Sequence, residues 1–238
     1  MKKLLLSFIL LTQLLFCATD EQIEHYLLVS NSDEQLLMLQ EAFCTLKQDA
    51  NISITQTKIL TTFKSHLKKN LTQKEMQSIL NNYNNFTLLQ FVSATSKPSF
   101  ETNTTLNYLK EIEEDNTQIL RIKLVKKITK QFYNTQGLSL FFNQFLKPLI
   151  THSIKNTLPN EDINTSTHIL NKIKKNYLYT TSKIAYEETL FATKEFSIEE
   201  LQELLTLSQL PIVKKETLSL FDAMAYALKQ LFTFKVQQ

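Results

Sequence analysis

Only one glycine, Gly137, occurs among the 238 residues of this chain. Loops that cradle phosphates and turns that bind dinucleotides need several glycines, because their backbone approaches the ligand or adopts positive φ. Tight β-hairpins favour Asn-Gly, Asp-Gly or Gly-Gly pairs, and the sequence contains none of these pairs. The chain is therefore expected to be all α-helical and to bind no nucleotide.

Helix-start signals agree with this fold class. Four segments have the capping-box pattern, in which a hydroxyl caps the helix and a Glu or Gln three residues later returns to the cap amide. They are Thr19–Gln22, Ser32–Gln35, Thr72–Glu75 and Ser197–Glu200, and each precedes apolar residues at helical spacing. Helices are predicted at residues 20–30, 33–47, 54–69, 73–84, 86–96, 117–133, 136–155, 165–193, 198–208 and 212–233.

Two segments of the chain resemble each other. Asn70–Leu80 aligns with Glu195–Leu205 without a gap, so that the capping residues coincide and one Glu, one Gln and one Leu are identical. This similarity predicts an internal duplication. The expected architecture is two tandem small helical bundles, at residues 19–97 and 117–238, joined by a polar linker at 98–116 that Pro98 opens.

The same segments carry a resemblance to a known family. The residues are Phe196-Ser197, Glu199-Glu200-Leu201, Leu204, Pro211 and Lys215 in the second half, and Leu71-Thr72, Glu75-Met76, Ile79 and Tyr83 in the first. Their pattern resembles the exported bacterial helical domains grouped as domain-of-unknown-function family 2059. Val213 stands where that family has glycine, Ser208 where it has tyrosine, and Phe86 where it has proline. The resemblance implies two tandem, diverged copies of a small exported helical bundle and assigns no activity.

The first eighteen residues have the pattern of a secretory signal peptide. Lys2 and Lys3 precede an almost wholly apolar run from Leu4 to Phe16, which is shorter than the roughly twenty residues of a membrane-spanning helix. We expect cleavage near Cys17 or Ala18 and a periplasmic or secreted protein. In the alternative reading Cys17 is lipidated and tethers the chain to a membrane, although the large Phe16 precedes it where that signal has a small residue.

Charge and cysteine content narrow the expected partners. Without residues 1–18 the chain keeps 24 basic against 23 acidic residues, so that it is nearly neutral. Arg121 is the only arginine, and arginine is the residue best suited to bidentate capture of phosphates and base edges. We therefore expect no nucleic-acid partner. Cys44 is the one cysteine certain to remain, so stability must come from an apolar core and not from a disulfide framework.

The residues that usually carry chemistry are not arranged as a site in the sequence. His25, His66, His152 and His168 lack the spacing of helical metal ligands, and His66 beside two lysines is expected to be exposed. Cys44 is expected to be a small buried residue. The acidic run Glu111, Glu113, Glu114 and Asp115 lacks the spaced ligands of a calcium loop and is expected to be solvated linker. No metal or cofactor is predicted.

One basic segment could bind a surface. Its residues Arg121, Lys123, Lys126, Lys127 and Lys130 alternate with apolar side chains. Such an amphipathic segment can lie on an anionic membrane or meet an acidic partner. The alternative is an ordinary surface helix with its lysines turned outward and its apolar face on the core.

Three sequons form a further group of candidates. Asn51, Asn103 and Asn164 each lie in a D/E-x-N-x-S/T sequence, which resembles the extended acceptor of bacterial N-glycosylation. All three fall in segments expected to be loops, and the hypothesis depends on whether the host has the pathway.

Together these patterns favour an exported, non-enzymatic helical protein of the bacterial cell envelope that binds a protein or a membrane surface, in an oligomeric state the sequence leaves open. The first alternative is a periplasmic enzyme whose acid/base pair forms only in the fold, for example Glu187 or Glu188 with Tyr186 or His168. The second is a chaperone-like binder of unfolded clients. A pocket with converging carboxylates would favour the enzyme, and an exposed apolar groove would favour a binder.

Overall fold

The computed structural model describes residues 17–45, 56–96, 103–157 and 163–230. These residues are helical, as predicted, and hold no strand apart from an isolated antiparallel bridge between Cys17 and Thr72. The predicted signal peptide, except for Cys17 and Ala18, and the candidate Asn51 lie outside the described residues. None of the helices in the described part of the chain has the length and hydropathy needed to cross a bilayer.

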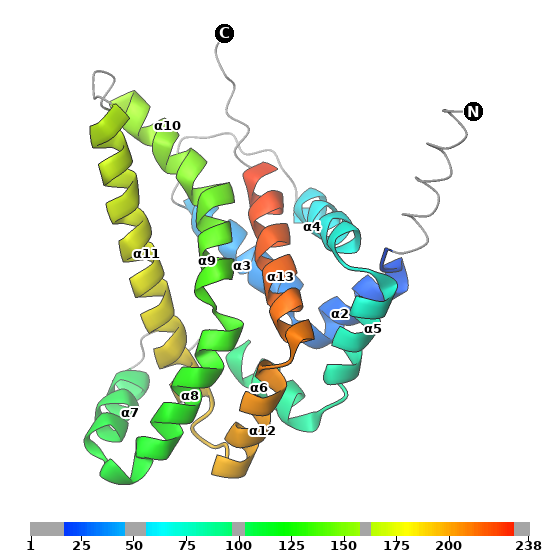
Figure 1. The fold of residues 1–238 in the computed structure, drawn as a ribbon, viewed down its shortest axis with the longest axis vertical. Helices are drawn as coiled ribbons and strands as arrows, with labels where there is room; N and C mark the ends of the chain where they lie inside the picture. The colour runs from blue at the N-terminus through cyan, green and yellow to red at the C-terminus, as the bar shows by residue number, and fades with distance from the viewer. Residues whose placement is uncertain (1–16, 46–55, 97–102, 158–162, 231–238) are drawn as a thin grey trace.

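The helices follow one another with short connections (Figure 1). They are α2 (Asp20–Ser30), α3 (Ser32–Thr45), α4 (Gln56–Asn70), α5 (Gln73–Asn82), α6 (Phe86–Thr95), α7 (Asn103–Glu114), the short 3-10 helix η1 (Asn116–Gln118), α8 (Ile119–Phe132), α9 (Thr135–Phe141), the π-helical turn η2 (Phe142–Leu146), α10 (Lys147–Thr157), α11 (Ile163–Ala192), α12 (Ile198–Ser208) and α13 (Pro211–Lys229).

Two of these elements differ from the prediction. α7 occupies most of the segment expected to be a linker, because Thr105 and Ile112 give it a buried face despite its acidic composition. The helix expected at 136–155 is interrupted by η2, a π turn that the apolar pattern does not reveal. Such turns are rare and often lie at functional sites.

Local capping explains where several helices begin. Thr19, Thr72 and Ser197 each form the predicted capping box with the residue three positions later. Ser32 differs, because it is the first residue of α3 and its buried hydroxyl lies 2.7 Å from the Ser30 hydroxyl. Asn31 between them adopts a left-handed conformation with φ of 57°, which turns the chain from α2 into α3.

The last helix, α13, lies in the middle of the molecule (Figure 1). It packs against α3, α4 and α5 from the first half of the chain and against α8, α9, η2 and α12 from the second. Residues of both halves, among them Phe63 of α4 and Phe145 of η2, join one hydrophobic cluster with Met224. The hydrophobic core therefore includes residues from both sides of the segment at 98–116.

The two similar segments have the same local structure. In each, a capping box starts a helix and the apolar residues at matched positions, such as Met76 and Leu201, are buried. Any two capped amphipathic helices share these properties, so the internal duplication stays a prediction.

Gly137 is needed for helix packing and not for a turn. It lies inside α9, and a Cβ atom added to it would lie 2.5 Å from Cδ2 of Phe221 in α13. The missing side chain lets α9 approach α13 closely, and this approach places the Phe221 ring.

We expect Gly137→Ala to destabilise the protein by about 1–3 kcal/mol through overpacking, although alanine normally favours a helix by up to about 1 kcal/mol. The free energy of unfolding in urea measures the change. Phe221→Leu in the same chain should recover part of the loss, because it removes the ring that clashes. A Gly137→Ala protein more stable than the wild type would contradict this account.

A second substitution tests the shared core. Phe63 is fully buried, and we expect Phe63→Ala to cost about 3–5 kcal/mol and to shift one calorimetric transition of the whole chain. Leu28→Ala is the matched control, because Leu28 is 81% exposed and should change little. A thermogram in which one transition shifts and another stays in place would show two independent units instead.

Candidate functional site

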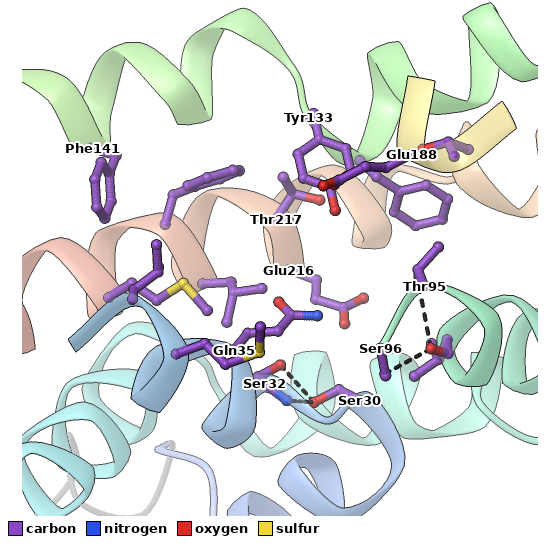
Figure 2. Close-up of a pocket in the computed structure, with 18 of the residues that line it drawn as sticks. Ser30, Ser32, Gln35, Thr95, Ser96, Tyr133, Phe141, Glu188, Glu216 and Thr217 are labelled. Carbon is purple, nitrogen blue, oxygen red and sulfur yellow. Dashed lines mark hydrogen bonds between the residues drawn. The ribbon is translucent and has the colours of Figure 1, made fainter. Parts of the chain in front are cut away.

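A cavity of about 510 Å³ lies between α13 and the helices around it (Figure 2). Its walls come from α2, α3, α6, η2 and α11, and from the ends of α5, α8 and α9. Most of the side chains that line it are apolar or aromatic, and they include Phe43, Phe91, Phe132, Phe141, Leu220 and Met224. A pocket of this size and lining, with a few polar groups, is the usual form of a small-molecule site.

Glu216 is the main polar group of the cavity. It projects from α13 and is only 8% exposed. Its Oε1 atom accepts a hydrogen bond of 2.6 Å from the hydroxyl of Tyr83, the residue that ends α5. No salt bridge to Glu216 is found within the described chain, so this carboxyl is buried against hydrogen-bond donors and not against a positive charge.

The hydroxyls of α2 and α3 extend this network. Tyr26 also hydrogen-bonds Glu216, and its ring meets the Tyr83 ring edge-on with centroids 6.0 Å apart. The Ser32 hydroxyl lies 3.5 Å from that of Tyr26 and 2.7 Å from that of Ser30. The hydroxyls of these two serines and two tyrosines therefore connect α2, α3 and the end of α5 to the Glu216 carboxyl group on α13.

The surroundings of Glu216 set its protonation. Burial raises the pKa of Glu216 to about 7, against an ordinary 4.5, although hydrogen bonds from Tyr83 and Tyr26 lower it in part. Burial, followed by the nearby Glu216 charge, raises the pKa of Tyr26 and of Tyr83 well above the usual value. Near neutral pH both tyrosines are therefore neutral donors, while Glu216 changes between its two states.

A second carboxyl group lines the cavity from α11. Glu188 is half-buried, and burial raises its pKa above the usual range. Burial, with the Glu188 charge, raises the pKa of Tyr133 to about 12. Figure 2 shows Glu188 and Tyr133 together on the side of the cavity opposite Ser30 and Ser32.

The acid/base pairs considered from sequence are not brought together in the described residues. Glu188 lines the cavity, but His168 is exposed and Tyr186 lines a separate hollow beside α8. Glu187 lies 3.6 Å from Lys183 on the surface of α11. The neighbour of Glu188 is instead Tyr133, which sequence reasoning did not select.

The basic segment forms α8, and its two faces have different environments. Leu124, Val125 and Ile128 are buried, whereas Lys123, Lys126, Lys127 and Lys130 are exposed. The Arg121 guanidinium donates hydrogen bonds of 2.9 and 2.6 Å to the carbonyls of Thr193 and Phe196. The only arginine therefore holds the connection from α11 to α12, and the middle of the apolar face of α8 is packed in the core, while Ile119 and Leu120 at its start are exposed.

His66 is not the exposed residue expected from its neighbours. Its Nε2 lies 2.7 Å from Oδ2 of Asp222, and its ring stacks on Tyr226 with centroids 4.3 Å apart. Asn70 and Gln144 each donate a 2.7 Å hydrogen bond to the same carboxylate. Burial alone would raise the pKa of Asp222, but these bonds lower it below the usual value. The cluster joins α4, η2 and α13.

The remaining candidates have no site around them in the described residues. Asn103 is exposed and begins α7, and Asn164 lies in the first turn of α11, so both are at helix starts and not in loops. Cys17 and Cys44 are half-buried and form no disulfide. Glu111, Glu113 and Glu114 are exposed on α7, and Asp115 accepts a 2.8 Å bond from the Thr117 amide. No group of histidine, cysteine or acidic residues is placed to hold a metal ion in the part of the chain described.

Sequence reasoning missed Glu216, although the pattern contains a signal for it. Val213, Glu216 and Leu220 lie at helical spacing on one apolar stripe of α13. A charged residue on a stripe that faces a core is unusual, because burying a charge costs free energy unless it is paired.

No family model, curated protein or solved structure matches this chain. The resemblance to domain-of-unknown-function family 2059 therefore stays a prediction.

The raised pKa of Glu216 predicts a pH dependence of stability. The folded state holds this proton more tightly than the unfolded state, so the contribution of Glu216 is complete below pH 4.5 and is lost as the pH rises through about 7. As the pH rises from 4.5 to about 7, the unfolding free energy of the wild type should fall by a few kcal/mol relative to that of Glu216→Gln. The slope of this fall is at most about 1.4 kcal/mol per pH unit.

Urea unfolding of the wild type and Glu216→Gln at pH 4.5, 6 and 8 measures this difference. Glu199→Gln is the control, because it makes the same substitution at an exposed position at the start of α12. A constant difference between the wild type and Glu216→Gln would contradict the burial of an ionisable group at this position.

Proposed function

We propose that this chain is an exported helical binding protein of the cell envelope that takes a largely apolar small molecule into the cavity around Glu216. The observation that carries this proposal is an apolar, aromatic-lined cavity of about 510 Å³ with a hydrogen-bonded carboxyl in its wall. Preformed sites of this kind bind ligands through apolar contact, and the few polar groups fix the orientation.

The other binding modes expected from sequence have less support. A membrane contact through α8 would rely on its four exposed lysines and on Ile119 and Leu120 at its start, because Leu124, Val125 and Ile128 are buried. Among the described residues, large exposed apolar side chains such as Leu28, Phe86 and Tyr179 are distributed over α2, α6 and α11, so they favour a protein partner or an unfolded client less than the cavity favours a small ligand.

An enzyme remains the second candidate, because of one observation. A carboxyl group whose pKa is about 7 can both take and give a proton near neutral pH, and Glu216 has this property inside a cavity. Binding is favoured because the hydroxyls that hydrogen-bond Glu216 belong to Tyr83 and Tyr26, which are neutral donors near neutral pH and not a second base.

Binding of the neutral dye Nile red tests the proposal. We expect the dye to fluoresce on binding to the chain and its affinity to fall at least about tenfold in Ala192→Phe, which fills the cavity with a ring. Ala42→Phe is the matched control, because Ala42 is exposed on α3 and should leave the affinity unchanged. Equal affinities in both variants would place the dye elsewhere and remove the support for a cavity ligand.

A further inference from the structure

The charges around the cavity all have one sign. Among the described residues that line it, Glu188 and Glu216 are acidic, and there is no lysine, arginine or histidine. A site that selects an anion or a carboxylic acid would need a positive group to hold it. The described residues that line the cavity carry negative charge instead, so the ligand that complements them is a cation.

Other carboxylates of the chain show how unusual Glu216 is. On the surface, Glu24 lies 2.6 Å from Lys64 and Asp20 lies 2.7 Å from Lys68. Half-buried Asp222 faces His66. Glu216 is the most buried of these acids, and the described residues give it no such partner. A buried charge without a counter-ion is unfavourable, and a bound cation would remove that cost.

The aromatic walls fit the same type of ligand. Phe91 and Phe132 stack with centroids 5.1 Å apart, and Tyr26 and Tyr83 meet edge-on beside the carboxyl. All four side chains line the cavity. Aromatic faces attract organic cations, and quaternary ammonium groups are commonly recognised by such aromatic surroundings.

We propose that the ligand of this cavity is an apolar organic cation, an amine or a quaternary ammonium compound, whose positive group is held by the Glu216 carboxylate while its apolar part packs against the aromatic walls. The inference rests on the proposed function, since it names the chemical class of the ligand at the same site.

The pH should control this preference. The titratable groups that face Glu216 are Tyr26 and Tyr83, and their raised pKa values keep them neutral. Glu188 lines the opposite wall, and burial raises its pKa as well, so both carboxyl groups take up protons as the pH falls, Glu216 around pH 7. A permanently charged ligand should bind more tightly at pH 8 than at pH 5.5, because protonation removes the negative charge that holds it.

Three probes of nearly equal shape test the inference with the full chain. Benzyltrimethylammonium is a cation, neopentylbenzene is its neutral carbon isostere, and phenylmethanesulfonate is an anion of similar shape. Each is titrated at pH 8 and pH 5.5, with binding followed by the NMR shifts of cavity residues. The hydrophobic effect alone favours neopentylbenzene, so a preference for the cation has to come from charge and aromatic contact.

We expect benzyltrimethylammonium to bind at least about tenfold more tightly than either other probe at pH 8. Glu216→Gln should abolish this preference and its pH dependence while neopentylbenzene binding stays, and Glu199→Gln should change neither. Because glutamine keeps an oxygen that can accept from Tyr83, the variant is expected to fold, and binding of neopentylbenzene reports that it has done so.

The contrary results separate the two proposals. Tighter binding of neopentylbenzene or phenylmethanesulfonate in the cavity would overturn the organic cation and leave a cavity ligand of another class. If none of the three probes bound in a manner blocked by Ala192→Phe, the proposed function would fail, and the inference with it.

Discussion

The packing of the helices in this protein depends on the hydrogen bonds that Tyr83 and Tyr26 donate to the buried carboxyl group of Glu216. A carboxyl group buried beside apolar side chains is tolerated only when donors satisfy it, and Tyr83 and Tyr26 come from elements more than 130 residues away in sequence. Because these partners lie at the end of α5 and on α2, they fix the N-terminal helices against α13. The same contact places a buried carboxyl group in the wall of a largely apolar cavity.

A second polar cluster holds α13 from another side. Asp222, six residues after Glu216, receives hydrogen bonds from His66 and Asn70 of α4 and from Gln144 of the π turn η2. The turn thus places Gln144 on Asp222 while its neighbour Phe145 stays in the core. Between the two clusters the approach of Gly137 sets the position of Phe221, so the cavity wall is defined by polar and steric contacts together.

The parts of this structure that were predictable from sequence are those encoded by neighbouring residues. Three capping boxes and the apolar spacing gave the helix starts at Asp20, Gln73 and Ile198, since a cap acts within three residues. The shared core was not predictable, because sequence periodicity shows that α4 and α13 each have an apolar face and does not show that these faces meet. The candidate site was missed for the same reason: Glu216 joins a buried hydrogen-bonded cluster only where α13 meets Tyr26 and Tyr83, and the partners of Glu188 depend on how α8 and α11 pack.

The central place of α13 also has a consequence for how the chain is made. A polypeptide is synthesised from its N-terminus, and α13, whose last residue is Lys229, is the final helix of the described chain. Tyr26, Tyr83 and Phe63 therefore lack their α13 partners until residues 211–229 have been synthesised. The late synthesis of the central helix therefore leaves the described helices of the first half without their main packing partner until α13 has been made.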